Sequence, residues 1–199
     1  MSVESLGGDF VYPFQNKFII PLKNTVTGIN SKKMQDEGFK VKSVMDPVKQ
    51  YDFEDKAKIG VEYHSALELL DLKRPYEKNS DFKLVDYNKI KLAHEKLSPL
   101  VKDAIAIKKE AEFTMFIPYN QIVYSDVEDR VLIQGVVDLL IEKENSIVLV
   151  DYKFSSLPAK VLKNKYLEQL NLYKLAIEEA YKKPVEHMFI YSINSGELI

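Results

Sequence analysis

The chain has 199 residues, of which 46% are hydrophobic and 29% charged, and its formal net charge is −2. This length is sufficient for one domain with a well-buried core. The absence of cysteine excludes disulfides, thiolate metal sites, cysteine nucleophiles and iron–sulfur clusters. Any bound metal would need oxygen and histidine ligands, which favours Mg²⁺ or Mn²⁺. The charge gives no global sign of nucleic-acid affinity, so such binding would depend on local lysines or on a partner that delivers the strand.

The N-terminal part of the chain has the weakest pattern. Residues 1–56 alternate short apolar pieces with turn-prone polar stretches, and we expect an irregular segment or linker packed on a domain that spans residues 57–199. The opening MSVESLGGDF has no signal-peptide character, and no apolar run approaches the ~20 residues of a membrane span. We therefore expect a soluble, cytoplasmic protein without a membrane partner.

The middle of the chain has clearer periodicity. It predicts, in order, helices from about Ile59, from Asp86 to Leu97 and from Ser98 to about Lys109, and then a strand from Glu112 to Tyr124. The first helix is indicated by leucines at helical spacing. The third is indicated by Ser98-Pro99, which resembles an N-cap followed by proline at the first helical position.

The most informative stretch is residues 131–153, VLIQGVVDLLIEKENSIVLVDYK. Two apolar, β-branched runs flank the polar segment 143–146, a pattern typical of a β-hairpin. If the turn centres on Glu144-Asn145, the numbers of paired residues sum to 289. Asp138 then faces Asp151 across the two strands.

Lys153 joins these two acids, because side chains alternate along a strand and place it on the same face as Asp151. Two acids and a lysine at the end of a buried sheet suggest a divalent-metal site aimed at phosphate. Asp-x-Lys occurs three times, beginning at Asp71, Asp81 and Asp151, but only the last copy follows a buried-looking strand and has an acid opposite it. On spacing alone, a structural salt bridge from Lys153 to Asp138 or Asp151 is an equally good explanation.

After the hairpin, a helix is predicted from about Asn164 to Lys182 and a last strand from Val185 to Ile193. Tyr166, Gln169 and Tyr173 stand at i, i+3 and i+7 of that helix and share one stripe. The stripe suits stacking on bases or sugars and hydrogen bonding to phosphate. Packing on the sheet explains the tyrosines as well or better, but the Gln169 amide needs a polar partner. Helices and strands around one sheet predict a single α/β domain.

The histidines and Glu112 carry little weight individually. His64 lies in a predicted helix but not beside another ligand-type residue, and a lone histidine is more often a structural group than a metal ligand. His94 and His187 have still less context and are interpreted as structural. Glu112 alone is typical of a cap or a surface acid.

Taken in order, these pieces resemble the RecB-type nucleases of the PD-(D/E)XK superfamily. The resemblance covers roughly residues 58–192 and runs through Gly60-x-x-x-His64, Glu112-Phe113, Gln134–Asp138, Val150–Lys153 and Tyr166-x-x-Gln169-x-x-x-Tyr173. Five motifs in the family's order are much more specific than any one of them. The wording QGVVDLL, LVDYKFSS and YLEQLNLYKLA is similar to the nuclease domain that ends AddA subunits of bacterial AddAB helicase–nucleases, and IIPLKNTVTGINS resembles the linker that enters that domain.

The resemblance implies a central mixed β-sheet flanked by α-helices, as in restriction endonucleases, and metal-dependent exonuclease or endonuclease activity on DNA. It implies as metal ligands His64, Asp138, Asp151 and the Tyr152 carbonyl, as catalytic residues Asp138, Asp151 and Lys153, and as supporting or DNA-binding residues Glu112, Tyr166, Gln169 and Tyr173. These ligands would hold one or two Mg²⁺ or Mn²⁺ ions. Lys153 would orient the attacking water and offset charge on the phosphate.

The resemblance also implies single-stranded DNA as substrate, a helicase domain or an AddB-like partner, and a role in double-strand-break repair. The missing cysteines match the cluster-free branch of the family. The chain lacks helicase motifs, and its abrupt ends favour a domain fragment over a stand-alone nuclease. One alternative is a non-catalytic DNA-binding or scaffolding module on a decayed nuclease fold, which the intact Asp138, Asp151 and Lys153 oppose. Another magnesium-dependent phosphate hydrolase is disfavoured by the helix with Gln169 and Tyr173.

Overall fold

The computed structural model describes the backbone of residues 23–25, 47–78, 81–118 and 130–199, and the side chains from residue 57 onward within those ranges. In chain order the elements are β1 (Lys23–Thr25), α2 (Pro47–Glu68), α3 (Tyr87–Leu97), a 3₁₀ turn (Ser98–Val101), β2 (Ala106–Pro118), β3 (Arg130–Glu142), β4 (Ile147–Lys153), α4 (Ala159–Tyr181), β5 (Val185–Ser192) and β6 (Glu197–Leu198). No helix in the described ranges is both long enough and apolar enough to cross a membrane.

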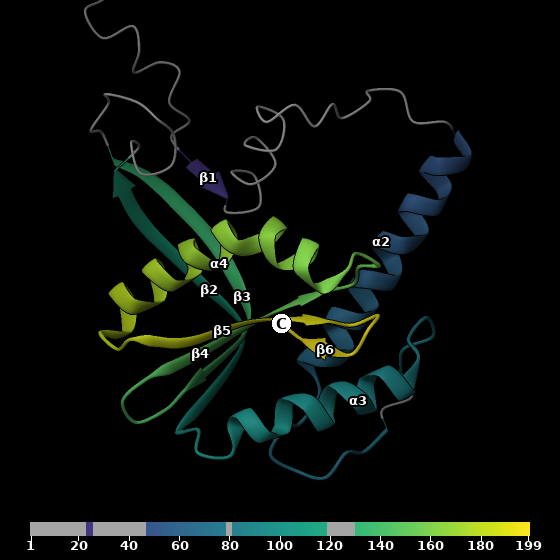
Figure 1. Cartoon of the computed structure of the whole chain (residues 1–199), viewed down its shortest axis with the longest axis horizontal. Coiled ribbons are helices and arrows are strands. Elements are labelled where there is room, and N and C mark those ends of the chain that lie inside the picture. Colours follow the sequence, from purple (N-terminus) through teal and green to yellow (C-terminus); the bar gives the residue numbers. More distant parts are fainter. Residues whose placement is uncertain (1–22, 26–46, 79–80, 119–129) are drawn as a thin grey trace, which may run out of the picture.

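The described strands form one mixed sheet of six strands (Figure 1). Along one edge β3 pairs antiparallel with β2, and along the other it pairs first with β1, in parallel, and then with β4, antiparallel. β4 continues to β5 in parallel, and β5 pairs antiparallel with β6. α4 lies over one face of the sheet and α3 over the other (Figure 1). The predicted α/β fold, a central mixed sheet flanked by helices, is therefore confirmed.

The β3–β4 hairpin has the predicted register. Leu139 pairs with Val150 and Glu142 with Ile147, so the numbers of paired residues sum to 289. Every residue of β4 except Lys153 is buried. Strands that are covered by helices on both faces read as continuous apolar runs, which is why this segment stood out in the sequence.

Two clusters of buried side chains hold the layers together. Along β4 the side chains alternate between them, so Leu149 packs under α4 whereas Val148 and Val150 pack against α2 and α3. Burying an aliphatic side chain of this size contributes about 1.5–3 kcal/mol, so β4 is held firmly from both faces. β4 ends at Lys153, so Asp151 and Lys153 lie where the strand leaves the core.

The prediction of a helix from Ser98 to about Lys109 is wrong. The Ser98 hydroxyl donates to the His94 carbonyl, 2.7 Å away, and so completes the last turn of α3 instead of opening a new helix. A single 3₁₀ turn follows, and the chain enters β2 at Ala106. The strand expected after this helix accordingly begins earlier than predicted, and residues 119–129 lie outside the described part of the chain.

The helices before and after this region are present with shifted ends. α3 spans Tyr87–Leu97, close to the predicted range, and Asp86 is its N-cap. α2 begins at Pro47 and so extends into the segment that was expected to be irregular; apart from β1, residues 1–46 lie outside the described part. α4 begins at Ala159, five residues before the predicted start, and ends at Tyr181. Lys182 follows in the left-handed conformation (φ 55°), a common way to close a helix.

Candidate active site

Asp138 lies where the two strands of the hairpin separate. The β3–β4 ladder ends at Leu139 and Val150, and beyond it the Asp138 carboxylate accepts the backbone N–H of Tyr152 at 2.5 Å. This side chain therefore replaces the missing main-chain partner and is held at the fork. Asp138 is buried, and it lines the same cavity as Asp151, so the predicted proximity of the two acids is present.

Asp151 is the most buried acid of the site, with 2% of its surface exposed. Its Oδ2 lies 2.6 Å from Lys153 Nζ, and its Oδ1 accepts from Gln169 Nε2 at 3.1 Å. The same amide nitrogen lies 2.6 Å from the hydroxyl of Tyr173. Gln169 thus has the polar partners that its place on an apolar stripe required. Contacts to both oxygens fix the orientation of the carboxylate, because charge-assisted hydrogen bonds are the strong ones.

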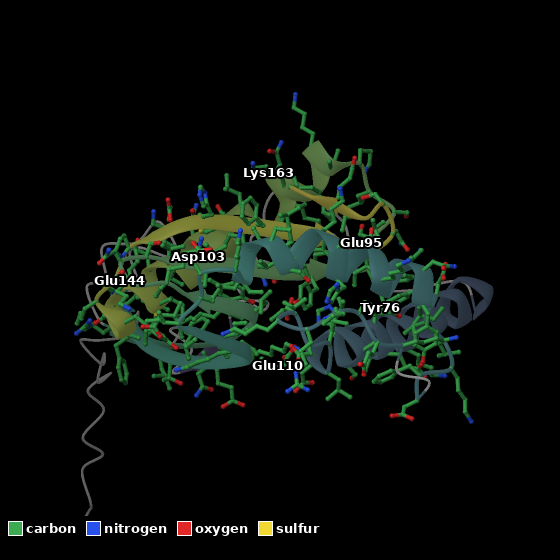
Figure 2. The ribbon with its side chains drawn as sticks, turned by 90° about the horizontal axis from the view of Figure 1, so that it is seen from below. Tyr76, Glu95, Asp103, Glu110, Glu144 and Lys163 are labelled. Atoms are coloured by element: carbon green, nitrogen blue, oxygen red, sulfur yellow. The ribbon has the colours of Figure 1, made fainter. Side chains whose placement is uncertain are left out.

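Three elements bring together a possible metal-binding group. His64 of α2, Glu110 of β2 and Asp138 of β3 each offer one ligand atom, and these atoms lie within 4.8 Å of one another. His64 Nδ1 is 3.5 Å from Asp138 Oδ1. Figure 2 shows Glu110 between the strands and α2. One imidazole and two carboxylates are a donor set that fits a divalent cation such as Mg²⁺ or Mn²⁺.

Glu110 is the site residue that sequence reasoning missed. The acid taken from the motif pattern was Glu112, which is exposed on the wall of the cavity and is not part of the group with His64. Glu110 has a φ of 48°, in the left-handed region that non-glycine residues seldom adopt. Such backbone strain concentrates at functional sites. Glu112 is the same residue type, and in a regular strand residues 110 and 112 point to the same face. The sequence pattern alone therefore could not distinguish Glu110 from Glu112 as the ligand.

Burial and the charge of neighbouring carboxylates raise the pKa values of Asp151 and Glu110. Burial raises the pKa of Asp151 to about 6, with Asp138 adding to the shift and Lys153 opposing it. Burial and then the charge of Asp138 raise the pKa of Glu110. For His64, burial lowers the pKa, but the hydrogen bond and charge of Asp138 outweigh it, so the pKa is raised. Without a cation the site therefore retains protons to unusually high pH.

In the absence of metal, the free energy of unfolding is expected to fall as the pH rises from about 4 to above 6. Asp151 has a pKa of about 6 when folded and about 3.9 when unfolded, so the folded state binds more protons in this window. The raised pKa values of His64 and Glu110 act with the same sign. The loss should amount to a few kcal/mol.

Chemical denaturation in EDTA across this pH range measures the effect, with Asp151→Asn as the comparison. The variant cannot lose a proton at this position, so its decline should be shallower than that of the wild-type protein. Parallel curves would contradict the prediction.

Two cavities flank the acids. One, of about 580 Å³, contains Asp138, Asp151 and Gln169 in its wall. The other, of about 560 Å³, lies on the side of His64 and Glu110. Lys153 lines both, so its ammonium group stands where a phosphate approaching from either side would meet the carboxylates.

The other predicted residues are distributed around this centre. Tyr166 is half-buried, and Lys153 Nζ lies 4.7 Å from the centroid of its ring. The Tyr152 side chain is buried on the α2 side, in edge contact with His64. Coordination by the Tyr152 carbonyl stays a prediction. His94 bonds the Arg74 carbonyl, outside this site.

The order of these residues along the chain also matches a known protein family. The sequence profile of the PD-(D/E)XK nuclease superfamily matches residues 39–198. The chain belongs to this superfamily. PD-(D/E)XK nucleases use divalent metals, and the His64, Glu110 and Asp138 group fits that requirement by its donor chemistry.

Several relatives of this PD-(D/E)XK chain are named as the A-type subunits of ATP-dependent helicase/nucleases. The protein from Ruminiclostridium cellulolyticum is 36% identical over 104 residues, which cover 48% of this chain and 8% of the relative. That from Listeria innocua is 38% identical over 98 residues, or 43% of this chain and 8% of the relative. The Bacillus cereus protein is 26% identical over 229 positions, which cover 94% of this chain and 18% of the relative. The chain therefore spans less than a fifth of the length of these relatives.

Proposed function

We propose that this domain is a metal-dependent deoxyribonuclease that hydrolyses phosphodiester bonds at Asp138 and Asp151. The observation that carries the proposal is the convergence of His64, Glu110 and Asp138 next to the buried Asp151–Lys153 pair. A structural salt bridge alone needs neither the imidazole nor the third carboxylate. A divalent cation held there would lower the pKa of a water molecule, neutralise charge on the phosphate and fix in-line geometry.

Lys153 has the clearest role among the residues of the chain. Its Nζ is held by Asp151 Oδ2 and by the face of Tyr166, so its position does not depend on substrate. Burial lowers the pKa of Lys153, but the nearby Asp151 carboxylate outweighs this effect. The net pKa of Lys153 is therefore raised, and the group stays cationic. A fixed positive charge stabilises the extra negative charge that develops on the phosphate during attack.

Gln169 and Tyr173 act as positioning residues for Asp151. The amide of Gln169 holds Oδ1, and the hydroxyl of Tyr173 contacts the amide in turn. This contact chain restricts the orientation of the Asp151 carboxylate, which lines the same cavity as Asp138. Functional carboxylates held in this way are typical of preorganised sites.

We further infer that the domain acts on DNA as part of a helicase–nuclease. The relatives that are named as ATP-dependent helicase/nucleases support this assignment. A helicase would supply single-stranded DNA to the cavity and would compensate for the net charge of −2. In that case its partners would be a helicase domain and an AddB-like protein. It would act in recombinational repair, in the cytoplasm.

Release of nucleotides from linear single-stranded DNA tests the proposal. Wild-type protein is assayed with Mg²⁺, with Mn²⁺ and with EDTA, next to Lys153→Ala. Cleavage that requires both the metal and Lys153 is the expected result. Metal-independent cleavage, or equal rates with Lys153→Ala, would refute the mechanism.

A non-catalytic DNA-binding or scaffolding module on the same fold is the competing function. Decay of a nuclease usually removes a ligand, whereas Asp138, Asp151 and Lys153 are all in place and in contact with their neighbours. DNA binding without cleavage by folded, metal-loaded protein, with and without a helicase partner, would favour the module.

A further inference from the structure

The β2–β3 ribbon extends beyond the acids and has two contrasting faces. Phe113, Met115 and Ile117 of β2 are buried in the cluster under α4. The residues between them face outward, and among these Phe116 is 54% exposed. Of the phenylalanine and tyrosine side chains in residues 57–78, 81–118 and 130–199, this is the only exposed one. Single exposed apolar residues are common on protein surfaces, so exposure alone does not indicate a binding role for this ring.

Phe116 does not line the active-site cavity itself but lies two residues along β2 from Thr114, which does. Glu112 and Thr114 line this cavity from β2, and Gln134 and Val136 line it from β3. Because side chains alternate along a strand, Phe116 lies on the same side as Thr114, about 7 Å further from the acids. Gln134 Nε2 donates to Thr114 Oγ1 at 3.3 Å, so a polar pair lies between the acids and the ring.

The charges on the outward face of the β2–β3 ribbon favour contact with bases over contact with phosphates. The outward residues are Glu112, Thr114 and Phe116 on β2 and Leu132, Gln134 and Val136 on β3. Glu112 is the single charged member, and its carboxylate would repel a phosphate. Arg130 lies beyond the ring, and its guanidinium donates to the Phe116 carbonyl at 2.8 Å. A strand on this surface would turn its bases toward the ribbon and its backbone toward solvent.

We propose that Phe116 is a base-stacking platform for single-stranded DNA whose scissile phosphate lies at Asp138 and Asp151. The proposal rests on the proposed nuclease function and adds the path of the strand, which runs from the acids past the Thr114–Gln134 pair. Aromatic rings accept any base, because every base has a π-face, so the platform suits a nuclease that digests without sequence preference. A minimal phosphodiester bound at the acids does not reach the ring, which lies about 14 Å beyond Glu112 along β2.

Comparing a short with a long substrate distinguishes a base-stacking role of Phe116 from a structural role. Wild type, Phe116→Ala, Phe116→Trp and the control Ile105→Ala are compared on a thymidine nitrophenyl phosphodiester and on a single-stranded oligonucleotide of about a dozen residues. Ile105 is also exposed, at 61%, but lies before the start of β2, at the other end of the ribbon. Stacking of one base corresponds to about 5- to 150-fold in affinity.

Phe116→Ala is expected to raise KM for the oligonucleotide by a factor in that range and to leave hydrolysis of the small diester unchanged. Phe116→Trp should restore the oligonucleotide KM, and Ile105→Ala should match wild type on both substrates. An unchanged oligonucleotide KM in Phe116→Ala, or equal losses on both substrates, overturns the platform. Failure of wild type to hydrolyse the small diester with metal would instead count against the nuclease function itself.

Discussion

Asparagine in place of Asp151 is expected to slow cleavage of single-stranded DNA by at least ~10²–10³ while the domain stays folded. The substitution preserves the size of the side chain and the acceptor for Gln169 Nε2. It removes the negative charge beside Lys153 Nζ. Asparagine is neutral, so it cannot supply the anionic oxygen that a divalent cation prefers.

The chain contains its own control for this experiment. Asp71 begins another Asp-x-Lys sequence, but it is exposed and lies outside the site. Its carboxylate accepts the nearby backbone N–H of Lys73 at 2.9 Å and lies 3.5 Å from Arg74 Nε. Asp71→Asn is therefore expected to cleave DNA at the wild-type rate. In EDTA above pH 6, Asp151→Asn should also unfold at the same temperature as wild type or higher, because it removes one of the mutually repelling acids. Wild-type cleavage by folded Asp151→Asn would show that the site is elsewhere.

Glutamine in place of Glu110 is expected to weaken binding of Mn²⁺ by ~10–100-fold or more, whereas Glu112→Gln leaves it unchanged. The reason is geometric. The Glu110 carboxylate lies within ligand distance of His64 and Asp138, and the Glu112 carboxylate does not. The two substitutions are chemically identical and lie two residues apart on one strand, so each is the matched control for the other.

Titration calorimetry with Mn²⁺ measures this difference without any dependence on turnover. Circular dichroism of both variants shows that the strand has formed. Cleavage by Glu110→Gln should fall together with its metal affinity and recover partly at high Mn²⁺ concentration. Equal affinities for the two variants, or a larger loss in Glu112→Gln, would reverse the assignment of the third ligand.

Local sequence patterns were sufficient to predict the β3–β4 hairpin and the helix that follows it. The register that brings Asp138 near Asp151 depends on a turn centre and a side-chain period of two, and both are properties of adjacent residues. The Gln169–Tyr173 contact likewise follows from helical spacing within one element. Among the Asp-x-Lys copies, only the one that begins at Asp151 lies on a buried strand.

Non-local contacts could not be predicted in this way. The Ser98-Pro99 sequence fits the start of a helix, yet the Ser98 hydroxyl bonds back to His94 and the chain turns into β2. No ligand-type residue stands directly beside His64 in the sequence, and its place next to Glu110 and Asp138 depends on the packing of α2 against the sheet. The choice between Glu110 and Glu112 depends on one left-handed backbone conformation, which short-range propensity does not reveal for a glutamate.

The sequence by itself thus determined the fold class, the hairpin with its two acids and lysine, and the polar stripe of α4, because these follow from periodicity within single elements or between adjacent ones. Only the tertiary structure placed His64 and Glu110 near Asp138, as a group whose donor atoms fit a metal ion, and left Phe116 exposed on the ribbon next to the cavity. These features arise where α2, β2 and β3 meet, and contacts between distant segments are selected by packing of the whole core rather than by any local pattern.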